Sequence, residues 1–114
     1  MSKPRVSHLF MRVVDLDRTR TFYVDMLGLE ALAEYPGYLR IGDERFHIGI
    51  EEAATAEIGA AGLELNIEVD DVDATYDRLQ AQGVDVTADP ADMPWGARHA
   101  WLRDPDGYVL SIYS

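Results

Sequence analysis

Two stretches decide the fold, VVDLDRTRTFYVDMLGLE (residues 13–30) and VDDVDATYDRLQAQGVD (residues 69–85), because they carry the same helix signals. Asp15 and Asp71 are the predicted N-caps, since an aspartate there can accept a hydrogen bond from a free backbone N–H. Gly28 and Gly83 are predicted to end the two helices. The caps lie 71 − 15 = 56 residues apart and the glycines 83 − 28 = 55. One structural unit is therefore written twice.

Each predicted helix carries apolar residues at helical spacing, which indicates one face turned toward a core. In the first helix the apolar residues are Leu16, Phe22, Tyr23, Met26 and Leu27, and in the second they are Val72, Tyr76 and Leu79.

The segments around the helices repeat as well. Apolar strands are predicted before each helix, at residues 6–13 and 63–69, and a hairpin after each, at residues 38–50 and 101–113. The second hairpin contains DPDG (residues 104–107), with proline and glycine where a type I turn favours them. Each half therefore reads β-α-β-β-β.

The predicted fold class is α+β, with two tandem βαβββ modules forming a curved mixed sheet that has its helices on the outer face. The chain of 114 residues fits a single domain, with module one at residues 1–52, a linker at 53–62 and module two at 63–114. The other side of the sheet is expected to be an open crevice that takes a small molecule. The sequence leaves open whether the modules pair within one chain or swap across two.

The composition excludes several classes of partner. The formal net charge of −11 repels nucleic acid and anionic lipid, and it attracts cations. No apolar run is long enough to span a membrane, and the first residues lack the apolar stretch of a signal peptide, so a cytoplasmic protein is expected. Cysteine is absent, which excludes thiolate metal sites.

SHLFMRVVDLDRTRTFYVDMLGLE (residues 7–30), PWGARHAWLRDPDGY (residues 94–108) and the doubled βαβββ order resemble the vicinal oxygen chelate superfamily. That superfamily includes glyoxalase I, extradiol dioxygenases, fosfomycin-resistance enzymes and bleomycin-resistance binding proteins. The resemblance covers essentially the whole chain. It is fairly specific for the fold and weak for function, because this fold carries several chemistries and also pure binders.

The resemblance implies four positions that coordinate a divalent metal in the family's enzymes. Seven residues before each helix cap stand His8 and Glu64, and on the last strand of each module stand Gly49 and Ser111. Two of these four lack a charged or imidazole ligand, and open metal sites usually keep at least three protein ligands. No metal and no cofactor are therefore expected. A divalent metal held by His8, Glu64 and His47 is the alternative.

Loss of metal ligands resembles the bleomycin-resistance branch, which implies a homodimer that binds a drug without changing it. Strand alternation predicts a ligand-binding wall made of Tyr38, His47, Trp95, His99, Trp101, Ser111 and Tyr113. Aromatic walls in an acidic protein suit a planar, cationic ligand such as a glycopeptide antibiotic or an intercalator.

The first interpretation of function is therefore binding and sequestration of a small molecule. The alternatives are a metal-dependent lyase, isomerase or dioxygenase, and an accessory domain whose crevice serves an interaction partner. The residues also have structural interpretations: Trp101 and Tyr38 as core, His8 and His99 as hydrogen-bonded strand residues, and Glu64 as a solvated strand position. The chain has no nucleophile motif and no phosphate loop.

Overall fold

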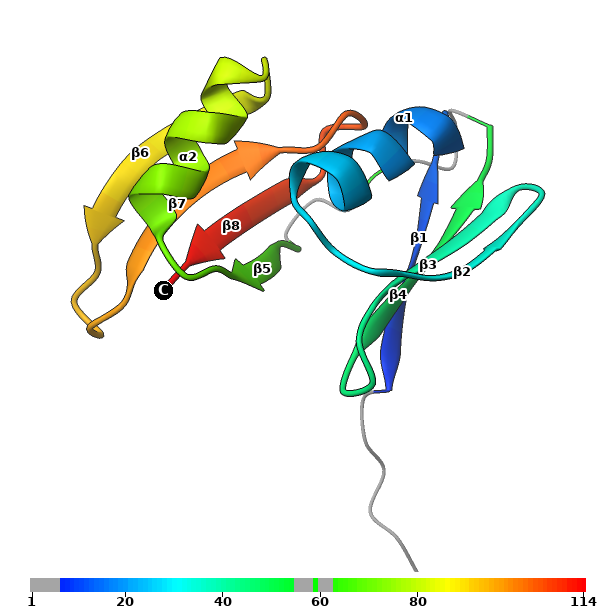
Figure 1. Ribbon diagram of the computed structural model, residues 1–114, viewed down its shortest axis with the longest axis horizontal. Helices are drawn as coiled ribbons and strands as arrows, with labels where there is room; N and C mark the ends of the chain where they lie inside the picture. Colours follow the sequence, from blue (N-terminus) through cyan, green and yellow to red (C-terminus); the bar gives the residue numbers. More distant parts are fainter. Residues whose placement is uncertain (1–6, 55–58, 60–62) are drawn as a thin grey trace, which may run out of the picture. The chain divides into compact units, whose positions relative to one another are not determined.

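The computed structural model describes residues 7–54, 59 and 63–114, and the chain forms two compact units, residues 1–58 and 59–114. The first unit contains β1 (His8–Val13), α1 (Leu16–Arg20), the helical turn η1 (Thr21–Met26), β2 (Ala31–Tyr35), β3 (Tyr38–Gly42) and β4 (His47–Glu52). The second contains β5 (Leu65–Glu68), α2 (Val72–Ala81), β6 (Asp85–Asp92), β7 (Arg98–Arg103) and β8 (Val109–Tyr113) (Figure 1). The prediction of two βαβββ units is confirmed. The predicted linker falls largely outside the described residues.

Each unit has one four-stranded mixed sheet. The strand order is β1-β4-β3-β2 in the first unit and β5-β8-β7-β6 in the second. The opening strand pairs parallel with the last strand, and the other neighbours pair antiparallel. Within each unit the helix covers one face of the sheet (Figure 1). The face away from the helix is therefore the place where a further group can bind.

The predicted helix signals act as expected. The Asp15 carboxylate accepts from the backbone N–H of Arg18 at 3.0 Å, and that of Asp71 accepts from Ala74 at 3.1 Å. Gly28 and Gly83 both follow the last helical residue with φ of 87°, a conformation that favours glycine.

The first helix differs from the second in its last turn. The backbone N–H of Leu27 donates to the carbonyl of Phe22, five residues earlier, at 2.9 Å, so η1 is a π-helical turn. From cap to glycine the first helix spans 28 − 15 = 13 residues and the second 83 − 71 = 12. The wider turn accommodates the additional residue.

The core of each unit lies between the helix and the sheet face that the helix covers. The strand residues of this core are at most 6% exposed: Leu39, Ile41, Ile48 and Ile50 in the first unit, and Ala100, Leu102, Leu110 and Ile112 in the second. Burial of each large aliphatic side chain stabilises the fold by about 1.5–3 kcal/mol. Because side chains alternate along a strand, Gly49 and Ser111 lie on the opposite faces. The predicted strand phase is therefore correct.

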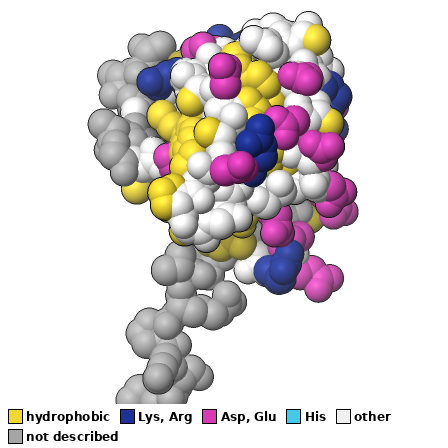
Figure 2. Space-filling view, turned by 90° about the vertical axis from the view of Figure 1, so that its left-hand side faces the viewer, with side chains coloured by type: hydrophobic (Ala, Val, Ile, Leu, Met, Phe, Trp, Pro, Cys, Tyr) yellow, Lys and Arg dark blue, Asp and Glu magenta, His cyan; other side chains and the backbone are white. Residues whose placement is uncertain are grey.

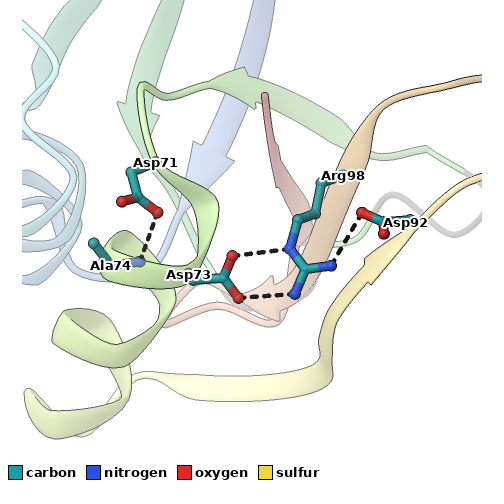
Figure 3. A network of polar contacts seen from close by, with 5 residues as sticks. All are labelled: Asp71, Asp73, Ala74, Asp92 and Arg98. Atoms are coloured by element: carbon teal, nitrogen blue, oxygen red, sulfur yellow. Dashed lines mark hydrogen bonds and ion pairs between the residues drawn. The ribbon is translucent and has the colours of Figure 1, made fainter.

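Arg98 joins the helix of the second unit to its sheet (Figure 3). Its guanidinium donates to both carboxylate oxygens of Asp73 at 2.8 and 2.9 Å, and to Asp92 at 3.1 Å. These hydrogen bonds to Asp73 lower the pKa of that carboxyl group. Arg98 thus ties β7 to the first turn of α2 and to the end of β6.

Acidic side chains are spread over the face of the molecule drawn in Figure 2, with hydrophobic side chains grouped between them. This distribution agrees with the net charge of −11. In the part of the chain that the structure describes, no helix is long and apolar enough to cross a membrane.

Candidate functional site

Ser111 lies under His99 on the face of the second sheet that points away from α2. Its side chain is fully buried, and its hydroxyl is 2.6 Å from Nδ1 of His99. His99 is only 8% exposed. A serine without solvent access cannot attack a substrate, so this pair is a fixed polar support and not a nucleophile with its base.

Three further aromatic rings surround His99. Trp101 stacks on it with ring centroids 5.3 Å apart, and Tyr113 stacks on it at 5.2 Å, with both planes within 18° of the imidazole. Trp95 meets His99 at 5.7 Å in an edge-on arrangement and is 68% exposed. We call Trp95, His99, Trp101 and Tyr113 the aromatic face. The structure thus brings together four of the seven predicted ligand-binding residues, with Ser111 beneath them.

A carboxylate lies at the side of the aromatic face. Nε1 of Trp101 donates to both oxygens of Glu64, at 3.3 and 3.4 Å, and the side-chain amide of Asn66 donates to Glu64 at 3.3 Å. A cation stacked on the indole of Trp101 would therefore lie near a negative charge. Asn66 was missed by the sequence reasoning, although its spacing of two residues from Glu64 places it on the same strand face.

The equivalent face of the first unit is filled around Gly49. A Cβ added there would lie 3.0 Å from Oη of Tyr38 and 3.2 Å from Cδ1 of Phe10. Arg40 donates from Nε to Oη of Tyr38 at 3.1 Å. Tyr38 and Phe10 therefore take the space that a longer side chain at position 49 would use. The sequence gave no sign of this role for Phe10.

His8 and His47 form a separate pair in the first unit. Their rings stack with centroids 4.8 Å apart and planes 7° apart, and Nδ1 of His8 is 2.8 Å from the Ser7 hydroxyl. Burial lowers the pKa of His47, and the neighbouring His8 and Arg40 lower it further. Because nitrogen lone pairs lie in the ring planes, two nearly parallel rings cannot both point at one ion. A shared metal would require at least one ring to rotate.

The four family positions do not fit a metal site. Gly49 has no side chain, and the Ser111 hydroxyl is uncharged, buried and hydrogen-bonded to His99. His8 lies in the first unit, and the Glu64 carboxylate accepts from Trp101 and Asn66 in the second. Within the described ranges 7–54, 59 and 63–114, no three His, Asp or Glu side chains cluster closely enough to hold an ion.

The first unit also contains a cavity of about 230 Å³ between the start of α1 and the β2–β3 hairpin. It is lined by Leu16, Asp17, Arg20, Glu34, Tyr35, Pro36, Gly37, Tyr38, Leu39 and Glu52. Of the predicted ligand-binding residues, only Tyr38 lines it. A signal was available in the sequence, because Gly28 and Tyr38 are 38 − 28 = 10 residues apart whereas Gly83 and Trp101 are 101 − 83 = 18.

Comparison with known proteins places the chain among relatives with two kinds of names. The family model of the Glyoxalase/Bleomycin resistance protein/Dioxygenase superfamily matches residues 5–112. A "Probable lactoylglutathione lyase" of Vibrio cholerae is 36% identical over 98% of this chain and 91% of its own length. A "Lactoylglutathione lyase" of Haemophilus influenzae is 33% identical over 95% of this chain and 90% of its own length.

Among solved structures, TnmS3, an antibiotic binding protein from Streptomyces sp. CB03234, is similar with a TM-score of 0.80. It is 30% identical, and the match covers 98% of this chain and 96% of TnmS3. A glyoxalase/bleomycin resistance protein from the same Streptomyces strain is 31% identical, with a TM-score of 0.74 and coverage of 96% and 100%.

Proposed function

Because the chain belongs to the Glyoxalase/Bleomycin resistance protein/Dioxygenase superfamily, we propose that it binds and sequesters a small molecule at the aromatic face, without a complete metal site. The proposed ligand is flat, aromatic and cationic. The observation that carries the proposal is the stack of Trp101, His99 and Tyr113 beside the Glu64 carboxylate. The similarity to the antibiotic binding protein TnmS3 supports it.

The chemistry of the face suits such a ligand. Flat rings stack on indole and phenol with a gain of about 0.5–1.5 kcal/mol beyond burial, and a cation over a tryptophan ring adds about 0.5–2 kcal/mol. The protein's net negative charge raises the local concentration of cations and speeds their encounter with the face.

Tryptophan fluorescence gives a direct test, because both tryptophans of the chain, Trp95 and Trp101, belong to the aromatic face. Aminoacridine, a flat tricyclic cation at pH 7, is expected to quench this fluorescence and to raise the melting temperature. At a hundredfold excess over Kd the stabilisation is about 2.7 kcal/mol. If no flat cation in a panel changes either signal, the proposal is wrong.

Two controls make the test specific. Acridine, which is uncharged at pH 7, is expected to bind more weakly than aminoacridine. Glu64→Gln is expected to reduce this difference because it removes the charge and keeps an oxygen that can accept from Trp101. Mass spectrometry of the ligand recovered after incubation distinguishes sequestration, which leaves the mass unchanged, from chemical modification.

A metal-dependent lyase is the second candidate function, and the names of the Vibrio cholerae and Haemophilus influenzae relatives favour it. It predicts lactoylglutathione lyase activity after addition of nickel or zinc, and loss of that activity with a chelator or in His8→Ala. Sequestration predicts no such activity and no stoichiometric metal by elemental analysis.

We further propose a homodimer, as in the bleomycin-resistance branch that the sequence resembles. Sedimentation equilibrium should then give about twice the chain mass of 12.8 kDa. A value equal to the chain mass at micromolar concentration would contradict the dimer without affecting the proposed binding.

A further inference from the structure

His99 has one ring nitrogen that is hydrogen-bonded within the protein and one that is not. Nδ1 is 2.6 Å from the hydroxyl of Ser111. Among the described residues, Nε2 has no hydrogen-bonding partner, and it is not sealed from solvent, although 92% of the residue is covered. A side chain that is more than nine-tenths buried thus presents one polar atom without a partner.

The surrounding rings determine where this atom points. Trp101 and Tyr113 stack on the two sides of the imidazole, so only its edge is accessible. Nδ1 is directed at Ser111 in the sheet, and Nε2 lies on the other side of the ring. Trp95 meets this ring edge-on and is itself 68% exposed, so it can move aside for a ligand.

The hydrogen bond to Ser111 determines which nitrogen carries the proton. Ser111 is fully buried, and within the described part of the chain its hydroxyl has no other partner than Nδ1. If Nδ1 donated to the serine oxygen, the serine O–H would be left without an acceptor, at a cost of about 1–3 kcal/mol. The serine therefore donates and Nδ1 accepts, which leaves the proton of the neutral ring on Nε2.

We propose that Nε2–H of His99 is a hydrogen-bond donor that selects flat ligands carrying a carbonyl-type acceptor, an inference that rests on the proposed function. Ser111 is the positioning residue, because it fixes the tautomer. The position that holds a metal ligand in the family's enzymes then serves to orient a donor for an uncharged oxygen.

A matched pair of flat compounds tests the proposal. A fluorenone with an aminoethyl arm and the fluorene with the same arm differ only in the ring carbonyl. The wild-type protein is expected to bind the fluorenone about fivefold more tightly, the fold-change of one net hydrogen bond. Quenching of Trp95 and Trp101 measures both affinities.

The informative variant is His99→Phe/Ser111→Ala. Phenylalanine keeps a ring in the stack, and alanine removes the hydroxyl that would otherwise lose its partner. The affinity ratio should fall to about one, while fluorene binding stays within about twofold of wild type. Tyr113→Phe keeps the stack and both nitrogens of His99, and it should keep the ratio near five.

Each outcome has a distinct meaning. Equal affinity for the two compounds in the wild-type protein overturns the role of His99 and leaves the proposed binding function standing. Absence of binding by either compound overturns the proposed function, and the inference with it. Nitrogen-15 NMR of the imidazole gives a readout independent of any ligand: a proton on Nε2 supports the inference, and a proton on Nδ1 overturns it.

Discussion

The two units share one fold, yet the sheet faces that point away from their helices differ. In the first unit Gly49 leaves room for the ring of Tyr38 to lie against the strand, and His8 stacks on His47. In the second unit Ser111 stands at the equivalent position and holds His99 between two aromatic rings.

This difference shows that one position on the last strand decides what each face can do. Glycine allows a neighbouring side chain to fill the space, which closes the surface. Serine keeps a buried hydroxyl that must find a partner, and this requirement fixes the orientation of the imidazole above it.

A second difference lies at the helix starts. The hairpin of the second unit extends to the pair Asp92 and Arg98, so that Arg98 reaches Asp73 on α2. The hairpin of the first unit ends at the pair Tyr35 and Tyr38, and the cavity lies there. The shorter connection leaves open the space beside the helix start.

The largest effect is expected where the two units are alike, at the core positions facing the helices. Leu110→Ala and Ile50→Ala should each lower the free energy of unfolding by about 2–5 kcal/mol, because each leaves a cavity at a fully buried site. Urea denaturation measures both. Leu63→Ala, at a side chain 64% exposed, is the control. A cost for Leu110→Ala no larger than that of this control would contradict the assigned strand phase.

Ser111→Ala is expected to have the next largest effect, about 1–3 kcal/mol of unfolding free energy, because Nδ1 of His99 would be left buried without a partner. His99→Phe/Ser111→Ala removes both partners and should cost less than the sum of the two single substitutions. Additive costs in this double-mutant cycle, measured by urea denaturation, would show that the hydrogen bond contributes nothing.

Gly49→Ala should cost about 1 kcal/mol, since the new Cβ would approach Oη of Tyr38 and Cδ1 of Phe10 and force them to shift. In a Tyr38→Ala background the same substitution should be neutral or stabilising, because the ring is gone and alanine restricts the unfolded chain. Thermal denaturation of the four proteins compares the two backgrounds. An equal cost in both would mean that Tyr38 does not fill this space.

The depressed pKa of His47 predicts a small dependence of stability on pH that belongs to the first unit. Its folded-state pKa is below the ordinary value of 6.5, so the unfolded chain binds the proton more readily. The resulting stabilisation is present above pH 6.5 and is lost as the pH falls through the lowered pKa. Urea denaturation between pH 7.5 and 5 should therefore show a shallower pH dependence for His47→Gln than for wild type, and parallel curves would refute it.

The smallest effect is expected at the helix starts, where Asp73 and Asp17 are equivalent positions, 73 − 17 = 56 residues apart. Both favour the helix N-terminus, but only Asp73 is held by Arg98. Asp73→Asn should lower the melting temperature more than Asp17→Asn, and the difference should shrink in high salt. Equal shifts would show that the exposed Arg98 pair adds no stability.

Much of the candidate site could be predicted by counting from Asp15 and Asp71, because a strand alternates its side chains with a fixed period of two. That count places His99, Trp101, Ser111 and Tyr113 on one face without any coordinates. It could not find the stacking of His8 on His47, the ring of Tyr38 over Gly49, or the π-helical turn. These depend on side-chain rotamers and on how neighbouring strands are aligned.

The amino-acid sequence alone determined the duplication, the helix caps and the strand phase, because capping and periodicity are local properties of the chain. Only the tertiary structure decided that Ser111 is paired with His99 and that Asp73 is paired with Arg98. These partners are 12 and 25 residues apart and meet through sheet register and packing, which no local signal contains.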